Sequence, residues 1–293
     1  MGPDIEPDIE VETLQQPPSL PRLYATAALT ARGRTGKGPL PERALRLTSL
    51  RVDRERLLRY QHLCGFQVGD LLPHTWPQVL AFPLQTELMA RRDFPLPLPG
   101  LVHLENTITV HRPLTADDTL ELGVRAEHLR EHPKGLLVNL VTEVAVAGEH
   151  AWTGRSTYLR RGPSHDVPPP ARSPEPPSGE PAAVWRLPGD TGRRYAAVSG
   201  DVNPIHLHRL TARAMGFPRA IAHGMYSTAR VLAALGPATS GPSTSHVWFR
   251  KPLLLPGTVA LAVEHRDAGE VVAGLRSRDG RTEHLVLTWR PTA

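Results

Sequence analysis

The chain has 293 residues, of which 40% are hydrophobic and 22% charged, and this composition excludes a fibrous or disordered protein. The formal net charge is +5, but acidic and basic residues are interspersed and only 5% of residues are aromatic, so we expect no nucleic-acid partner. A single cysteine, Cys64, excludes an intramolecular disulfide, and no secretory signal or eighteen-residue apolar run is present. We therefore expect a cytoplasmic protein without a membrane span.

The composition also predicts two domains. Residues 163–183 combine many prolines with Ser, Gly and Glu, which predicts a semi-rigid linker. On this basis residues 1–19 are a disordered or extended tail, residues 20–162 form an N-terminal domain, and residues 184–293 form a C-terminal domain. The chain is long enough for each domain to bury its own core.

The N-terminal half contains one helix pattern followed by strand patterns. Apolar residues at helical spacing predict a helix over residues 76–94, although Pro83 is expected to perturb its first turns. Alternating residues then predict antiparallel strands over residues 101–114, 118–130, 135–148 and 150–161.

The C-terminal half repeats this order. A helix is predicted over residues 224–235, closed by Gly236-Pro237, and strands follow over residues 244–256, 257–267, 269–277 and 282–290. The halves align at the turn after their first strand, where HRPLTADDTLELGV corresponds to RKPLLLPGTVALAV. We infer a duplicated unit of one helix laid against a curled antiparallel sheet, which is an α+β architecture.

Polar residues gather in the segment before the second long helix, residues 193–225. Asp201 and His206 are five residues apart and would diverge on a regular helix, so only a bent loop brings them together. Asn203-Pro204 predicts such a turn, because Asx side chains bond nearby backbone. A short helix is expected over residues 207–215, with His208 as one of its solvated residues.

This loop suits proton chemistry. An aspartate with a histidine in reach can divide proton transfer between two groups of different pKa, which suits addition or removal of water. Gly224 opens the long helix, so its N–H can stabilise an enolate oxygen developing on a thioester carbonyl. A simpler interpretation makes Asp201 and Asn203 helix caps, makes His206 a structural histidine, and leaves Ser199 only bonding the loop. His223 is compatible with either role.

The segment YAAVSGDVNPIHLHRLTARAMGFPRAIAHGM resembles the signature of the MaoC-like, or type 2 enoyl-thioester hydratase, family. The resemblance implies the hot-dog fold and the reversible hydration of trans-2-enoyl thioesters to (3R)-hydroxyacyl thioesters, with no metal and no redox cofactor. By matching position it places the catalytic acid–base pair on Asp201 and His206, the water-orienting asparagine on Asn203, and the oxyanion amide on Gly224.

The N-terminal half is similar to the first hot dog of single-chain, double-hot-dog dehydratases of actinobacterial type, through CGFQVGDLLPHTWPQVLAFPLQTELM, FPLPLPGLVHLEN and RSTYLRR. It lacks a D-x-N-P-x-H motif, so we expect it to be catalytically silent and replacement of His103 to leave the rate nearly unchanged. Many family members carry Asp-Pro shortly after the catalytic histidine, where this chain has His208-Arg209-Leu210. This departure concerns the start of the short helix.

The expected function is therefore the reversible dehydration of (3R)-hydroxyacyl thioesters in fatty-acid or related lipid metabolism. The alternative is a non-catalytic hot-dog protein that binds acyl thioesters or partners another dehydratase. A thioesterase of this fold would need an acid or base on the long helix, where residues 225–235 carry no carboxylate. The expected partner is acyl-CoA or an acyl carrier protein thioester, bound by a monomer with an internal pseudo-dimer or by a homodimer. The predicted substrate-binding residues are Ser199, His223, Arg219 and Arg250.

Overall fold

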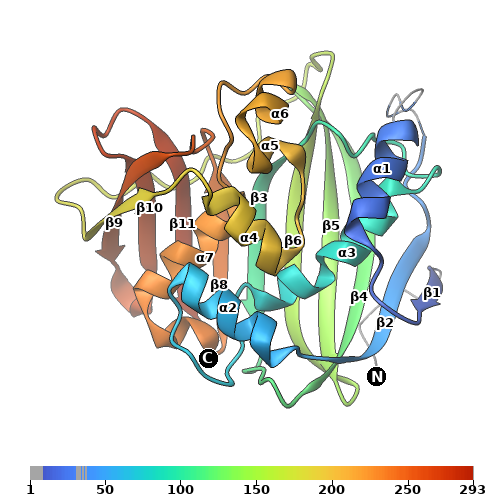
Figure 1. Cartoon of the computed structure of the whole chain (residues 1–293), viewed down its shortest axis with the longest axis horizontal. Coiled ribbons are helices and arrows are strands. Elements are labelled where there is room, and N and C mark those ends of the chain that lie inside the picture. Colours follow the sequence, from blue (N-terminus) through green and yellow to red (C-terminus); the bar gives the residue numbers. More distant parts are fainter. Residues whose placement is uncertain (1–8, 31–33, 35, 37, 293) are drawn as a thin grey trace.

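The strands form one continuous, mainly antiparallel sheet in the computed structural model, which describes residues 9–30, 34, 36 and 38–292 (Figure 1). The N-terminal strands are β1 (Glu10–Leu14), β2 (Arg43–Arg51), β3 (Leu101–Val110), β4 (Thr119–His132), β5 (Gly135–Val146) and β6 (Glu149–Arg161). The C-terminal strands are β7 (Ala183–Leu187), β8 (Ser243–Phe249), β9 (Gly257–His265), β10 (Val271–Ser277) and β11 (Glu283–Pro291).

The strand order shows the duplication directly. The order is β1-β2-β4-β5-β6-β3-β8-β11-β10-β9-β7, so the run β2-β4-β5-β6-β3 returns in reverse as β8-β11-β10-β9-β7. The two runs join where β3 pairs with β8, from Glu105 opposite Trp248 to Val110 opposite Ser243. The predicted correspondence of the first turns is confirmed, because it aligns β4 with β9. The α+β, double hot-dog architecture is therefore the observed one.

The helices cover one face of the sheet, with α3 and α7 lying across the strands of their own halves (Figure 1). The helices are α1 (Leu20–Thr30), α2 (Arg54–Cys64), α3 (Trp76–Ala90), α4 (Thr191–Ser199), α5 (Pro204–Leu207), α6 (Arg209–Ala214) and α7 (Gly224–Leu235), with single 3₁₀ turns at Pro237–Ser240 and Asp267–Gly269. Within the described ranges, none of them is both long enough and apolar enough to cross a bilayer.

Helix α3 is buried on almost every side, which is the pattern of a core helix. Its two buried glutamines are linked within the core, since Gln78 donates to Gln85 at 3.1 Å and Gln85 donates to Thr142 at 2.8 Å. The helix continues through Pro83, so the expected perturbation of its first turns does not interrupt it. Helix α7 has the predicted bounds and ends at Gly236 with a positive φ of 99°.

Several elements were not predicted, among them α1, α2, α4, β2 and β7. Helix α2 nevertheless carries local signals, because Asp53 caps its first turn by accepting from the Arg56 N–H and Gly65 closes it in the left-handed conformation. The expected helix over residues 207–215 is wrong as a single element. His208 lies in extended conformation between α5 and α6, and its Nδ1 accepts from the Leu210 N–H as an N-cap. It is therefore a cap and not a mid-helix residue.

The division into tail, two domains and linker stays a prediction. Residues 163–182 contain no helix or strand. Within the segment expected to be a tail, Glu10–Leu14 forms β1, which pairs in parallel with β2.

Candidate active site

The polar loop begins where α4 ends. Gly200 has a positive φ of 81°, a conformation that glycine adopts without strain, and its N–H closes the helix by donating to the Ala196 carbonyl. The chain then turns sharply, and the Asp201 N–H donates to the Ser199 hydroxyl at 3.1 Å. Ser199 is buried, and the contact that its hydroxyl makes is this bond within the loop.

Two Asx bonds continue the bend. The Asn203 N–H donates to Asp201 Oδ1 at 3.1 Å, and the Ile205 N–H donates to Asn203 Oδ1 at 3.4 Å. Pro204 then starts the single turn of α5, where its missing N–H costs nothing. The expectation of a bent loop held by Asx side chains is confirmed, and Asn203 is also the N-cap of α5.

The loop brings His206 against His223. Their rings stack with centroids 3.7 Å apart and planes inclined by 25°. His206 Nδ1 donates to the Ile221 carbonyl at 2.8 Å, and His223 Nε2 donates to the Asp201 carbonyl at 3.0 Å. Because a carbonyl can only accept, these bonds fix both tautomers. The unprotonated nitrogens are then His206 Nε2 and His223 Nδ1.

Ligand atoms of Asp201, His206 and His223 lie within 4.8 Å of one another. Both histidines are buried, and the Asp201 side chain is 21% exposed. Such a trio has the donor types that could hold a metal ion, and it is equally suited to hold a water molecule between a carboxylate oxygen and an imidazole nitrogen. The five-residue separation of Asp201 and His206 is closed by the loop, as the sequence predicts.

Burial and mutual charge set the protonation states. Burial lowers the pKa of His206 below its usual value, although Asp201 and the Ile221 carbonyl oppose this. Burial and then repulsion by His206 lower the pKa of His223 to about 3. Burial tends to raise the pKa of Asp201, but the neighbouring imidazoles and hydrogen bonds from Tyr24 and Asn203 outweigh it and hold that pKa below its ordinary value. At neutral pH the site therefore holds a carboxylate beside two neutral imidazoles.

Gly224 starts α7 immediately after His223, so its N–H belongs to the unpaired, positive end of the helix dipole. A Cβ at this position would lie 2.9 Å from two atoms of the Phe249 ring, which is too close for any other residue without a shift. Phe249 in turn packs against His103, whose ring centroid is 5.0 Å away. A residue of the N-terminal half therefore lines the same region, and burial lowers the pKa of His103 to about 4.

The N-terminal half also holds the loop from outside. Arg56 of α2 donates to the Val198 carbonyl at 2.7 Å and to the Ser199 carbonyl at 3.1 Å, which fixes the last turn of α4. Tyr24 of α1 donates to Asp201 Oδ1 at 2.8 Å. Sequence reasoning missed both residues. Neither lies in a motif, and each contact joins segments more than 140 residues apart, so no local signal could have identified them.

The two arginines predicted to bind substrate lie in different surroundings. Arg219 lines a surface depression of about 550 Å³ whose wall also includes Leu207 and His208, next to His206 in the chain. Arg250 is exposed and contacts the Ser173 hydroxyl in the proline-rich segment, and it is not among the residues that line that depression. The structure therefore brings Ser199, Asp201, Asn203, His206, His223 and Gly224 together in one site and sets Arg250 apart.

Comparison with known proteins gives consistent results for both halves. A family model described as "MaoC like domain" matches residues 171–287, and one described as "FAS1-like, dehydratase domain region" matches residues 67–153. The chain is 39% identical over 283 residues to the 3-hydroxyacyl-thioester dehydratase X of Mycobacterium tuberculosis, and the match covers 94% of this chain and 99% of that protein.

Solved structures show the same relationship. The crystal structure of HtdX of Mycobacterium tuberculosis matches with a TM-score of 0.75 and 39% identity, over 85% of this chain and 100% of that one. A MaoC-like dehydratase from Phytophthora capsici matches with a TM-score of 0.71 over 88% of this chain and 97% of that one, at 19% identity, which is a likeness of fold. With a relative this similar along nearly its whole length, the chain belongs to the MaoC-like dehydratase family.

Proposed function

We propose that the protein catalyses the reversible dehydration of (3R)-hydroxyacyl thioesters to trans-2-enoyl thioesters, in fatty-acid or related lipid metabolism. The observation that carries this proposal is the convergence of an Asp201 carboxylate oxygen and a His206 ring nitrogen within 4.8 Å, beside the N-terminus of α7, together with a His206 tautomer whose Nε2 is unprotonated. The relative named 3-hydroxyacyl-thioester dehydratase X supports the same reaction.

The protonation states suggest how hydration proceeds. A carboxylate and a neutral Nε2 are both acceptors, so Asp201 and His206 together orient a water molecule through its two hydrogens. Attack of the water oxygen on C3 transfers one of these protons to the pair and moves the double-bond electrons toward the thioester carbonyl. The Gly224 N–H stabilises the enolate oxygen that develops there. A proton then passes from the pair to C2.

Dehydration is the same path in reverse. The pair removes a proton from C2, the C2–H electrons form the double bond, and the C3–O bond breaks as the leaving hydroxyl takes a proton and departs as water. Asn203 helps to place the water through the bend that its backbone and side chain hold. No electrons are gained or lost, so the reaction requires no oxidant.

The test is an absorbance assay of the conjugated enoyl thioester. Crotonyl, octenoyl and dodecenoyl groups are presented on CoA and on acyl carrier protein, and we expect the absorbance to fall with hydration while no thiol is released. Thiol release would identify a thioesterase instead. Binding of the enoyl thioester without turnover would support the non-catalytic alternative and contradict the proposal.

The carrier is proposed to bind at the depression described above, which four arginines line together with the single acid Asp190. Three of these side chains are anchored to backbone carbonyls, and each guanidinium has five N–H groups, so donors are left for phosphate. CoA and acyl carrier protein both present phosphate on a pantetheine arm, and either fits this surface. The four arginines are Arg193, Arg209, Arg213 and Arg219.

Charge reversal tests the carrier proposal. Arg219→Glu should raise KM for the carrier-bound substrate severalfold and weaken the fall of kcat/KM with ionic strength, because surface attraction is screened over about 10 Å at 0.1 M salt. A short pantetheine thioester should be converted as by the wild type. Equal losses on both substrates would contradict the carrier role. Arg250→Glu tests the second predicted contact in the same way.

A cytoplasmic monomer with an internal pseudo-dimer is part of the proposal. Pairing of β3 with β8 joins the two units within one chain, as a dimer interface would join two single units. The free, buried thiol of Cys64 suits a reducing compartment. Sedimentation equilibrium at the mass of one chain is the expected result, and the mass of two chains would favour the homodimer.

A further inference from the structure

Tyr24 makes a contact with the acid–base pair from the other end of the chain. Its hydroxyl donates to Asp201 Oδ1 at 2.8 Å, and the same oxygen accepts from the Asn203 N–H at 3.1 Å. Oδ1 thus has two donors, while Oδ2 lies 3.8 Å from His223 Nε2, on the side of the imidazoles. Two donors on one oxygen restrict the rotation of the carboxylate and leave Oδ2 on the side of the imidazoles.

The direction of this bond is fixed. An ionised carboxylate can only accept, so the Tyr24 hydroxyl is the donor. Burial, reinforced by the negative charge of Asp201, raises the pKa of Tyr24 well above its ordinary value, so the phenol keeps its proton throughout the working pH range. Tyr24 therefore acts as a fixed donor and not as an acid or base itself.

We propose that Tyr24 is a positioning residue, supplied by the N-terminal segment, that orients the Asp201 carboxylate and keeps it ionised for the hydration step. The proposal rests on the proposed function, in which Asp201 is half of the acid–base pair. It assigns the N-terminal half a part in the chemistry, although that half has no acid–base motif of its own.

The contact is supported by close packing of α1 on the loop. Leu20, one turn before Tyr24, lies so close to Gly200 that its Cδ1 would be 2.8 Å from a Cβ there. Gly200 is also the residue whose positive φ turns the chain into Asp201. The absence of a side chain at Gly200 therefore allows both the turn and the approach of α1.

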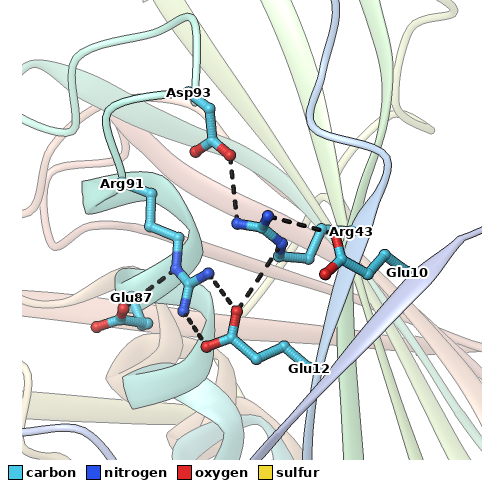
Figure 2. Close-up of polar contacts among 6 residues, drawn as sticks. All are labelled: Glu10, Glu12, Arg43, Glu87, Arg91 and Asp93. Carbon is cyan, nitrogen blue, oxygen red and sulfur yellow. Dashed lines mark hydrogen bonds and ion pairs between the residues drawn. The ribbon is translucent and has the colours of Figure 1, made fainter.

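The strand that leads into α1 is clamped by an ion network (Figure 2). Arg91, which follows α3, forms a two-pronged pair with Glu12 of β1, at 2.6 and 2.7 Å. Figure 2 shows that Arg43 of β2 reaches both Glu10 and Glu12 of β1. Arg43 also pairs with Asp93, and the distance from its Nη1 to Asp93 Oδ2 is 3.4 Å. β1 is thus tied to β2 and to the end of α3, which limits where α1 can lie.

Other ionisable groups also act on Asp201, and the test must separate them from Tyr24. These groups lie on four further elements and in the turn before α7. They are Tyr158 of β6, Tyr195 of α4, His103 of β3, His206 of α5 and, in the turn, His223. Loss of the Tyr24 donor removes a bond made only to the ionised carboxylate, so the pKa of Asp201 should rise. The acid limb of kcat/KM should then move to higher pH.

The experiment compares Tyr24→Phe with Tyr60→Phe. Phenylalanine keeps the ring of Tyr24 and removes only its hydroxyl, so we expect kcat to fall about tenfold, since the lost bond is charge-assisted, and the acid limb to move to higher pH. Tyr60 is a buried tyrosine of the same half whose hydroxyl bonds Thr75 at 2.7 Å. It also interacts with Tyr195, so it reaches Asp201 only through another side chain. Tyr60→Phe should lower the melting temperature and leave the pH profile unchanged.

A second measurement uses the substrate-free protein. Carboxyl ¹³C titration by NMR, with the Asp201 signal assigned through Asp201→Asn, should show a higher Asp201 pKa in Tyr24→Phe. If Tyr24→Phe leaves both the Asp201 titration and the pH profile unchanged, Tyr24 does not position the carboxylate. This result would overturn the positioning role even if turnover by the wild type supports the proposed function. If the wild type does not turn over, the proposed function fails first, and the NMR titration still decides whether Tyr24 controls the carboxylate.

Discussion

At the scale of single residues, the structure leaves no room for a side chain at Gly224. Gly224→Ala would place its Cβ 2.9 Å from the Phe249 ring, so either the ring or the first turn of α7 must move. Since removal of an oxyanion donor costs about 100- to 1000-fold in kcat, displacement of this N–H should cost at least about tenfold, with KM less affected. Steady-state kinetics on the enoyl thioester measure this.

The double variant Gly224→Ala/Phe249→Leu is the control, because the smaller side chain makes room for the Cβ. It should recover much of the rate lost in Gly224→Ala, measured against Phe249→Leu alone. If Gly224→Ala turns over like the wild type, the N–H of that residue is not the oxyanion donor.

At the scale of elements, the clamp on β1 should matter to the site through α1. Glu12→Gln removes one charge from the two-pronged pair with Arg91, and partly exposed pairs of this kind contribute about 1 kcal/mol or less. We expect a small fall in melting temperature, faster proteolysis between β1 and α1, and a loss of kcat smaller than that of Tyr24→Phe. Glu10→Gln is the matched control, because Glu10 is 71% exposed and should change neither rate nor proteolysis. Equal effects in the two variants would show that the clamp does not act through Glu12.

Elements with regular patterns were predictable from the sequence, and those with weak or interrupted patterns were not. The eight long strands and the two central helices follow from alternating and helical spacing, and the bounds of α7 follow from Gly224 and Gly236. β1 and β7 have five residues each and lie at the two edges of the sheet, so their patterns are weak. β2 has nine residues, but an irregularity in its pairing between Leu47 and Leu50 interrupts its alternation. The break at His208 depends on one side chain capping α6, which competes with the continued helix that local propensity favours.

At the scale of the whole molecule, the proximity of Asp201 and His206 was predictable because both lie within six residues in one motif. The support from Tyr24 and Arg56 was not, because these contacts exist only once α1 and α2 pack on the C-terminal unit. His103 is the intermediate case. Its strand was predicted, but its contact with Phe249 depends on β3 pairing with β8. Its predicted dispensability stays a prediction.

Buried neutral histidines in both halves predict acid lability of the whole fold. Burial lowers the pKa of His74 and of His103 to about 4, and that of His223 to about 3, from an ordinary value of 6.5. Below pH 6.5 the unfolded chain therefore binds more protons than the folded chain. The free energy of unfolding should be highest above that pH and should fall progressively toward about pH 4. Urea unfolding at pH 7.5, 6 and 5 measures this. His74→Gln should flatten the dependence, and a wild-type stability that does not change over this range would contradict the buried, neutral state of these histidines.

The central claim is that Asp201 and His206 act together on one water molecule. Asp201→Ala and His206→Ala should each lower kcat by at least about 100-fold while the unfolding transition is retained, and Asn203→Ala should be milder. Because the two groups act as a unit, the double variant should be little slower than the slower single variant. The measurement is the hydration rate of one enoyl thioester by the wild type and by these four variants. Turnover like that of the wild type in either single variant would contradict the account.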